Sequence, residues 1–187
     1  MFRKVRVPVL ESDRLMLRSW TKRDASDLYE YAKDPRVGPY AGWEPHKSLS
    51  ESRFVIDEVY LSRMNWAIML KESGKVVGNI GLDEDPIRRK INSRELGYSL
   101  SPQYWGQGIV PEAVRLVLDY VFRIMELECI TVRVETYNEK SRRVAEKCGF
   151  TFEGVLRHSY RRYDREISDL ACYSMLAGDY YERKGEK

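Results

Sequence analysis

Residues 94–136 read RELGYSLSPQYWGQGIVPEAVRLVLDYVFRIMELECITVRVET, and this segment indicates the fold class. Its first eight residues alternate in polarity as a strand does, and apolar residues then recur every three or four positions over 111–125. Alternation returns over 129–136. A strand, a helix and a strand in this order predict a right-handed crossover between parallel strands.

The flanking segments predict more strands and helices around this unit. We expect a strand over 15–20, helices over 21–34, 51–63 and 139–147, and two hairpins, one over 66–82 and one over 150–176. Ser48 or Ser50 can cap the helix over 51–63, and an aromatic-rich loop over 38–45 precedes it. The charged run 83–90 is expected to be a solvated connection. Together these elements predict a mixed sheet covered by helices.

Length and composition indicate a single domain over 1–187, with frayed ends over 1–11 and 178–187. The chain is 43% hydrophobic and 33% charged, which is typical of a globular protein and excludes disorder over most of it. It has neither an apolar run of the roughly 20 residues that span a bilayer nor a secretory signal. We therefore expect a cytoplasmic protein without membrane association.

Few residues of this chain suit metal or hydrolase chemistry. Cys129, Cys148 and Cys172 are odd in number and form no CxxC pair, so we expect reduced thiols and no metal site. Two histidines and the lack of a GxSxG motif argue against a Ser-His-Asp hydrolase. The net charge of +3 favours anionic ligands without marking a dedicated nucleic-acid binder.

The segment 104–112 joins a predicted strand to a helix N-terminus, where free backbone N–H groups and the helix dipole can bind an anion. It does not match a P-loop, which ends in Gly-Lys-Ser/Thr. It also does not match a dinucleotide fingerprint, because Pro111 stands where a third small residue is needed. Neither ATP nor NAD is favoured, and a tight turn with two glycines is the alternative.

Five motifs in order carry a resemblance to a known family. They are SDRLMLR at 12–18, ELGY at 95–98, YWGQG with a following Glu-Ala over 104–113, Asn138 with Ser141, and EKCGFTFEG at 146–154. Together they resemble the GNAT superfamily of N-acetyltransferases, and more closely its branch of ribosomal-protein N-terminal acetyltransferases. The resemblance implies the GNAT fold of the α/β (α+β) class: a mixed, mostly antiparallel sheet with splayed central parallel strands flanked by helices.

The resemblance implies acetyl-CoA as co-substrate, lying between the splayed strands. Its pyrophosphate would rest on the loop and its pantetheine arm would run beside one strand, with an asparagine near the arm and a basic residue near the ribose phosphate. The residues implied are Trp105, Gly106, Gln107, Gly108, Ile109 and Val110 for the loop, Ser99, Leu100 and Ser101 for the strand, then Asn138 and Arg143. Trp105 and Val110 depart from the loop pattern of the wider superfamily. Asn138 can instead be a turn residue, and Arg143 part of a solvated helix face.

Amine acetylation needs a base, and the departing CoA thiolate can use an acid. Glu95 is the candidate base, acting through water; a strand-end carboxylate paired to an arginine is the alternative. The resemblance implies a tyrosine as general acid at the position of Ala145, which cannot donate a proton. Ser141 is therefore the candidate acid, and Tyr137 is the second candidate. The alternative for Ser141 is a helix cap. Cys148 as an acylated nucleophile lacks a neighbouring histidine.

The acceptor is less defined. Trp43, Glu44, Phe54 and His158 are expected around it, with core packing as the alternative for the aromatics. Four arginines over 157–165 can attract an acidic protein tail or RNA, or only water. The predicted function is acetyl transfer to a protein N-terminal amine. We expect association with the ribosome and a monomer or homodimer. A small amine such as a polyamine, amino acid or antibiotic is the alternative acceptor, and a non-catalytic CoA- or RNA-binding module is the alternative class.

Overall fold

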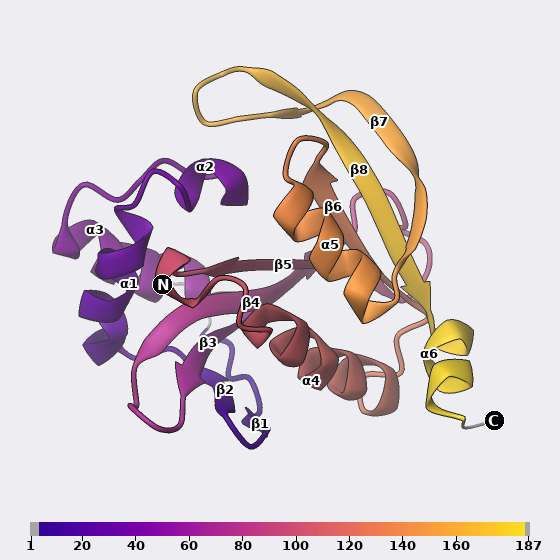
Figure 1. Cartoon of the computed structure of the whole chain (residues 1–187), viewed down its shortest axis with the longest axis horizontal. Coiled ribbons are helices and arrows are strands. Elements are labelled where there is room, and N and C mark those ends of the chain that lie inside the picture. Colours follow the sequence, from indigo (N-terminus) through magenta and orange to yellow (C-terminus); the bar gives the residue numbers. More distant parts are fainter. Residues whose placement is uncertain (1–3, 186–187) are drawn as a thin grey trace.

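The computed structural model describes residues 4–185, which build one eight-stranded sheet. Its strands are β1 (Leu10–Glu11), β2 (Leu15–Ser19), β3 (Met64–Leu70), β4 (Val76–Glu84), β5 (Ser93–Leu100), β6 (Cys129–Glu135), β7 (Thr151–Arg161) and β8 (Ile167–Leu176). They lie in the order β1-β2-β3-β4-β5-β6-β8-β7 (Figure 1). Every neighbouring pair is antiparallel except β5 and β6, which confirms the predicted mixed sheet with a central parallel pair.

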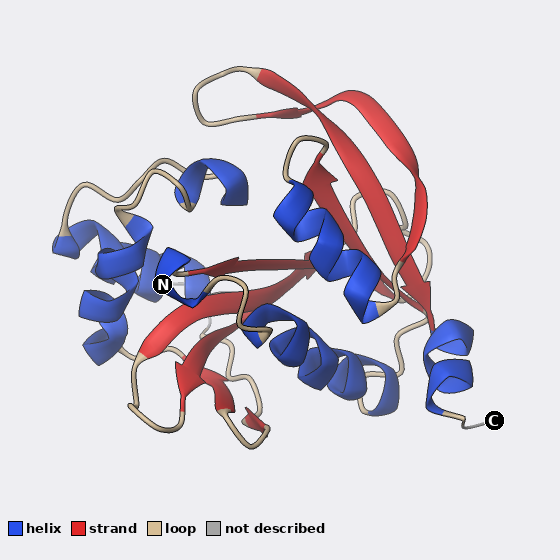
Figure 2. Cartoon of the chain, viewed as in Figure 1, coloured by secondary structure: helices blue, strands red, loops and turns tan. Residues whose placement is uncertain are grey.

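Helices cover both faces of this sheet (Figure 2). They are α1 (Ala25–Ala32), α2 (Gly38–Ala41), α3 (Leu49–Phe54), α4 (Ile109–Arg123), α5 (Glu139–Cys148) and α6 (Ala177–Lys184), with short 3-10 turns η1 (Lys22–Asp24) and η3 (Pro102–Tyr104) and a π-helix η2 (Val55–Tyr60). Alternation along β3 divides the core: Trp66 and Ile68 pack with α4, whereas Ala67 packs with α1 and η2 on the opposite face. Within residues 4–185 no helix is long and apolar enough to cross a membrane.

The β5–α4–β6 crossover forms as its sequence predicts. The apolar side of α4 is buried against the sheet, with Val114, Val117 and Val121 at most 1% exposed. The helix begins at Ile109, two residues before the expected start, because Gly108 takes the left-handed conformation that ends the loop. Pro111 lies in the first turn, where a backbone N–H has no intrahelical partner to lose.

Several segments differ from expectation. The predicted helix over 51–63 is α3 followed by the π-helix η2, with Ser48 as its cap, and part of the loop over 38–45 forms α2. Asp85 lies in the run expected to be solvated, yet it is buried and accepts bonds from the N–H groups of Ile87 and Arg88. Its other carboxylate oxygen accepts from the Thr131 hydroxyl on β6 at 3.2 Å, a tertiary contact that local propensity could not show.

Parts of both expected frayed ends are elements of the fold. Residues 10–11 pair with β2 as β1. Residues 178–184 belong to α6, where the ring of Tyr180 stacks on Phe122 at 4.9 Å and its hydroxyl donates to Asp119 at 2.6 Å. These contacts are tertiary, so the polar composition of the tail did not reveal them. Residues 1–3 and 186–187 of the expected frayed ends lie outside the described part.

Candidate active site

The central parallel strands separate soon after they meet. β5 and β6 pair only where Ser93, Arg94 and Glu95 face the first three residues of β6. Beyond that point β5 stays paired with β4 as far as Leu100, and β6 stays paired with β8 as far as Glu135. Beyond Glu95 the facing edges of the two strands are therefore not paired with each other. This opening is the splay that the resemblance implies.

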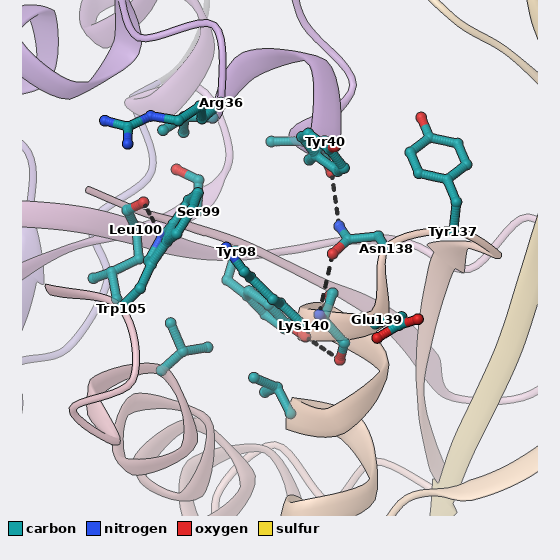
Figure 3. Close-up of a pocket in the computed structure, with 15 residues that line it drawn as sticks. Arg36, Tyr40, Tyr98, Ser99, Leu100, Trp105, Tyr137, Asn138, Glu139 and Lys140 are labelled. Atoms are coloured by element: carbon teal, nitrogen blue, oxygen red, sulfur yellow. Dashed lines mark hydrogen bonds between the residues drawn. The ribbon is translucent and has the colours of Figure 1, made fainter. Parts of the chain in front are cut away.

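A cavity of about 410 Å³ lies at this opening (Figure 3). It is lined by β5, the loop before α4, the start of α5 and α2, and its wall carries two basic side chains, Arg36 and Lys140. We call it the donor cavity. Ser99, Leu100, Trp105, Val110 and Asn138 of the predicted cofactor residues line it.

The glycine loop leads into α4 with left-handed backbone at two points. Gly106 and Gly108 have φ values of 77° and 75°, which only glycine adopts at little cost. The loop is fastened from β2's side of the sheet: Arg14 donates to the carboxylate of Glu112 and to the carbonyl of Gln107. The first N–H groups of α4 have no intrahelical partner, so they can bind an anion. Ile109, in contrast, buries its side chain in the core.

Trp105 fixes the wall of the donor cavity. Its indole N–H donates to the carbonyl of Leu100 at 2.9 Å, and the ammonium of Lys140 lies 3.6 Å from its ring centroid. The Leu100 carbonyl therefore already has a donor. Ser99 gives its hydroxyl proton to Asn79, and Ser101 donates its N–H to Val77 at 2.8 Å, so these two predicted residues hold β5 in the sheet.

Asn138 and Ser141 lie together at the start of α5, and Tyr98 contacts Ser141. The Asn138 side chain accepts from the Ser141 N–H at 3.2 Å as the cap of α5 and donates to the Tyr40 carbonyl at 3.4 Å (Figure 3). The hydroxyl oxygens of Ser141 and Tyr98 are 2.7 Å apart. Burial raises the pKa of Tyr98 above the ordinary value of a tyrosine, so this phenol keeps its proton.

A second cavity, of about 850 Å³, lies beside the donor cavity and shares Tyr40, Ala41, Tyr98, Asn138 and Ser141 with it. We call it the acceptor cavity. Its wall is charged and comes from the facing parts of β4, β5 and β6, with Tyr160 from β7 and Leu170 from β8.

Glu95 lines the acceptor cavity in a bidentate ion pair with Arg133, at 3.0 Å to Nε and 2.6 Å to an Nη atom. Burial raises the pKa of Glu95, and the opposing effect of Arg133 does not cancel it. This ion pair matches the alternative prediction for Glu95, a strand-end carboxylate paired to an arginine. It also places a carboxylate with a raised pKa in the wall of the cavity.

Of the four predicted acceptor residues, none lines the donor or the acceptor cavity among the described residues 4–185, and Trp43 lines a third cavity. It lies at a smaller cavity of about 310 Å³ and packs on His46 with 5.1 Å between ring centroids. Glu44 pairs with Lys47 on the surface, and Phe54 is 62% exposed. His158 is exposed at a bulge of β7 with φ at 49°. Exposed placement explains why these three side chains stay outside the cavities.

Arg143 does not line the donor cavity. It lies on the outer face of α5 and pairs with Glu139 at 3.4 Å. Ala145 is buried in the core. The sequence analysis missed several residues that line the cavities, among them Tyr98, Arg133 and Lys140. Alternation indicated the face of β5 that carries Tyr98, but only the register between β5 and β6 brings Arg133 to Glu95, and sequence patterns do not fix that register.

Comparisons with known proteins agree with this geometry. The family model of the acetyltransferase (GNAT) domain matches residues 14–151. "Uncharacterized N-acetyltransferase YoaA" of Bacillus subtilis is 32% identical over 90% of this chain and 97% of its own. A GNAT acetyltransferase structure from Bacillus anthracis superposes with a TM-score of 0.82 at 24% identity, over 91% of this chain and 99% of its own, and shows the same fold.

Two further relatives carry an acceptor in their names. "Putative ribosomal N-acetyltransferase YdaF" of Bacillus subtilis is 34% identical over 61% of this chain and 59% of its own. Spermidine N(1)-acetyltransferase of Escherichia coli is 26% identical over 77% of this chain and 76% of its own. With the family model matching most of its length, the chain belongs to the GNAT acetyltransferase family and is an N-acetyltransferase.

Proposed function

We propose that the protein transfers the acetyl group of acetyl-CoA to a primary amine, and that the preferred amine is a protein N-terminal α-amine. One observation carries the proposal: the donor and acceptor cavities meet at Tyr98, Asn138 and Ser141. A thioester entering from one cavity and an amine entering from the other would come together at this junction. Such an arrangement supports direct transfer.

The donor cavity has the features that acetyl-CoA requires. The N-terminus of α4, with Gly106 and Gly108 before it, offers backbone N–H groups to a pyrophosphate. The edge of β5 that faces the splay offers main-chain groups to an extended amide-bearing arm, as an added strand would use them. Lys140 supplies positive charge at the same cavity, whereas the guanidinium group of Arg36 is paired with Asp34 at 2.6 Å.

The proton transfers follow from the acceptor side. An amine must be neutral to attack, and an α-amine with a pKa of about 7.8 is roughly 14% neutral at pH 7, against about 0.04% for a lysine side chain. Glu95 accepts the proton that the amine loses, through a water molecule. Ser141, hydrogen-bonded to Tyr98, donates to the departing sulfur. A thiol titrates near 8.5, so this donation contributes modestly.

The size and charge of the acceptor cavity support both acceptor classes. A cavity of about 850 Å³ has room for the first residues of a peptide, and the name of the relative YdaF favours a ribosomal protein as acceptor. The acidic groups in the same wall favour a cationic small amine, and the spermidine enzyme among the relatives is consistent with this second candidate.

The experiment measures the melting temperature with and without acetyl-CoA, then CoA release with N-terminal peptides, N-acetylated control peptides and polyamines. We expect a rise of several degrees with saturating acetyl-CoA, and CoA release with free N-terminal peptides only. Turnover with polyamines but not peptides would replace the α-amine by the small-amine acceptor. Acetyl-CoA binding without turnover on either class would overturn the proposed acceptors.

A further inference from the structure

The acceptor cavity carries more negative than positive charge among the described residues that line it. Its lining holds the carboxylates of Asp83, Glu84, Glu95 and Glu135 and the guanidinium groups of Arg63 and Arg133. Both guanidinium groups are taken by carboxylates of the same wall: Arg63 pairs with Asp83 at 3.1 Å, and Arg133 with Glu95 at 2.6 Å. Glu84 and Glu135 are left without a lining cation.

Glu135 differs from the other three carboxylates in being deeply buried. Only 6% of the residue is exposed, and its Oε2 atom has no hydrogen-bond partner among the described residues. The nearest cation is Arg162, whose guanidinium nitrogen lies 3.9 Å from Oε2, beyond hydrogen-bond distance. That guanidinium bonds instead to the Tyr137 hydroxyl at 2.8 Å and pairs with Asp164 at 3.1 Å.

A buried carboxylate oxygen without a donor is unfavourable, and such groups are usually bonded in folded proteins. Burial also raises the pKa of Glu135, and the charge of Arg162 together with a contact to the Ser168 side chain lowers this pKa only in part. Because the Oε2 atom is itself buried, an ammonium or guanidinium group in the cavity would reach it only after a change in the side-chain torsion of Glu135. Glu135 lies two positions along β6, about 7 Å, from Arg133, the ion-pair partner of the proposed base Glu95.

We propose that Glu135 binds a second cationic group of the acceptor, so that the preferred acceptors carry a positive charge a few ångströms from the amine that is acetylated. The inference rests on the proposed function. The second charge can come from a basic side chain next to a peptide N-terminus or from the far end of a diamine. Glu135 is then a specificity-determining residue, and Glu95 keeps the role of base.

The test compares KM for matched acceptors that differ only in that charge. Peptides beginning Ala-Lys and Ala-norleucine form one pair; 1,4-diaminobutane and butylamine form the other. In the unaltered protein we expect KM to be about 10- to 100-fold lower for the charged member, the range for a hydrogen bond to a charged group. The pair in which the charged member has the lower KM identifies the source of the charge, a peptide side chain or a diamine.

In Glu135→Gln this ratio should fall to about one, while kcat for the uncharged acceptor and the Kd of acetyl-CoA stay unchanged. Glu135→Asp should recover part of the ratio. Glu182→Gln, an exposed carboxylate on α6, is the control and should keep the full ratio. Melting temperatures and acetyl-CoA binding report whether each variant is folded.

A ratio of about one in the unaltered protein, or a full ratio retained in folded Glu135→Gln, would overturn the inference and leave the proposed function intact. Failure of all four compounds as acceptors, with acetyl-CoA still bound, would overturn the proposed function itself. If Glu135→Gln does not fold, the ratios in the unaltered protein and in Glu135→Asp decide, because an anchor shortened by one methylene should weaken only the charged acceptors.

Discussion

The phenolic oxygen of Tyr98 lies 2.7 Å from the hydroxyl oxygen of Ser141, at the junction of the donor and acceptor cavities. Tyr98 comes from β5 and Ser141 from the first turn of α5, so the bond joins the two sides of the splay. Ala145, at the position where the family resemblance implies a tyrosine, is buried and carries no ionisable group. A phenol therefore reaches the junction from the strand rather than from the helix.

If the pair donates the proton to the departing sulfur, removing either hydroxyl should slow turnover. We expect kcat to fall about 10-fold in Tyr98→Phe and in Ser141→Ala, less than the usual effect of an acid because the thiolate leaves readily. The double variant should lose little more than each single one, since both act through one hydrogen bond. Steady-state kinetics of CoA release measure this.

Tyr29→Phe is the matched control, because Tyr29 lies on α1 outside the donor and acceptor cavities. Additive losses in the double variant would contradict a shared role. An unchanged kcat in both single variants would show that the pair only holds β5 against α5.

Glu95 should give the enzyme an acidic limb in its pH profile. A base must be ionised to act, and burial raises the pKa of Glu95, so kcat/KM should rise with pH through a value above the ordinary glutamate range. In Glu95→Gln this limb should disappear and kcat should fall about 100-fold or more. An unchanged profile in folded Glu95→Gln would remove Glu95 from the chemistry and leave it as the partner of Arg133.

The sequence predicted the strands and helices that carry this site better than the side-chain contacts between them. Periodicity located β5, α4 and β6, and the motifs located Asn138 and Ser141, because these signals are local. Trp105 lines the donor cavity. The contacts Glu95–Arg133 and Tyr98–Ser141 depend on strand register and helix docking, which no local pattern encodes. The acceptor predictions Glu44, Phe54 and His158 relied on the segments expected to wall the acceptor, and the side chains of all three are exposed.

Asp24 and Arg18 should stabilise the fold over most of the pH range. Burial opposes ionisation of Asp24, but two bonds of 2.8 Å from Arg18 and bonds from Thr21 outweigh it and hold the pKa of Asp24 below its ordinary value. A lowered pKa means that the stabilisation is present above the unfolded value near 3.9 and is lost as the pH falls through the folded value.

Asp24→Asn should therefore lower the free energy of unfolding by about 2–3 kcal/mol at pH 7, as expected when one partner of a buried pair is removed. The difference from the unaltered protein should shrink below about pH 4. Urea denaturation at both pH values measures it. A loss of equal size at pH 3 and pH 7 would show that the charge of Asp24 does not matter.

Cys148 should not form an acetyl-enzyme. Burial raises the pKa of Cys148 to about 11, so roughly three thiols in ten thousand are ionised at pH 7.5. Cys148→Ser should keep kcat/KM within about two-fold, and double-reciprocal plots for both substrates should intersect. Parallel plots, together with an acetyl adduct on the intact protein by mass spectrometry, would contradict direct transfer.

Gly97 offers a steric test of the acceptor cavity. It lies on β5 between Glu95 and Ser99, lines the acceptor cavity, and a Cβ added there would meet no atom within 4 Å. Its φ is not in the left-handed region, so a β-branched side chain is tolerated by the strand. Valine at this position would fill space in the cavity without disturbing the packed core.

Gly97→Val should raise KM for the acceptor about 10-fold or more, with the Kd of acetyl-CoA unchanged, because Gly97 does not line the donor cavity. Gly97→Ala should give a smaller increase, since it adds one methyl group. Gly178→Val is the matched control: it lies on α6, and a Cβ there also meets nothing within 4 Å. Equal effects on acceptor KM and acetyl-CoA binding would show that one continuous site, rather than two meeting cavities, holds both substrates.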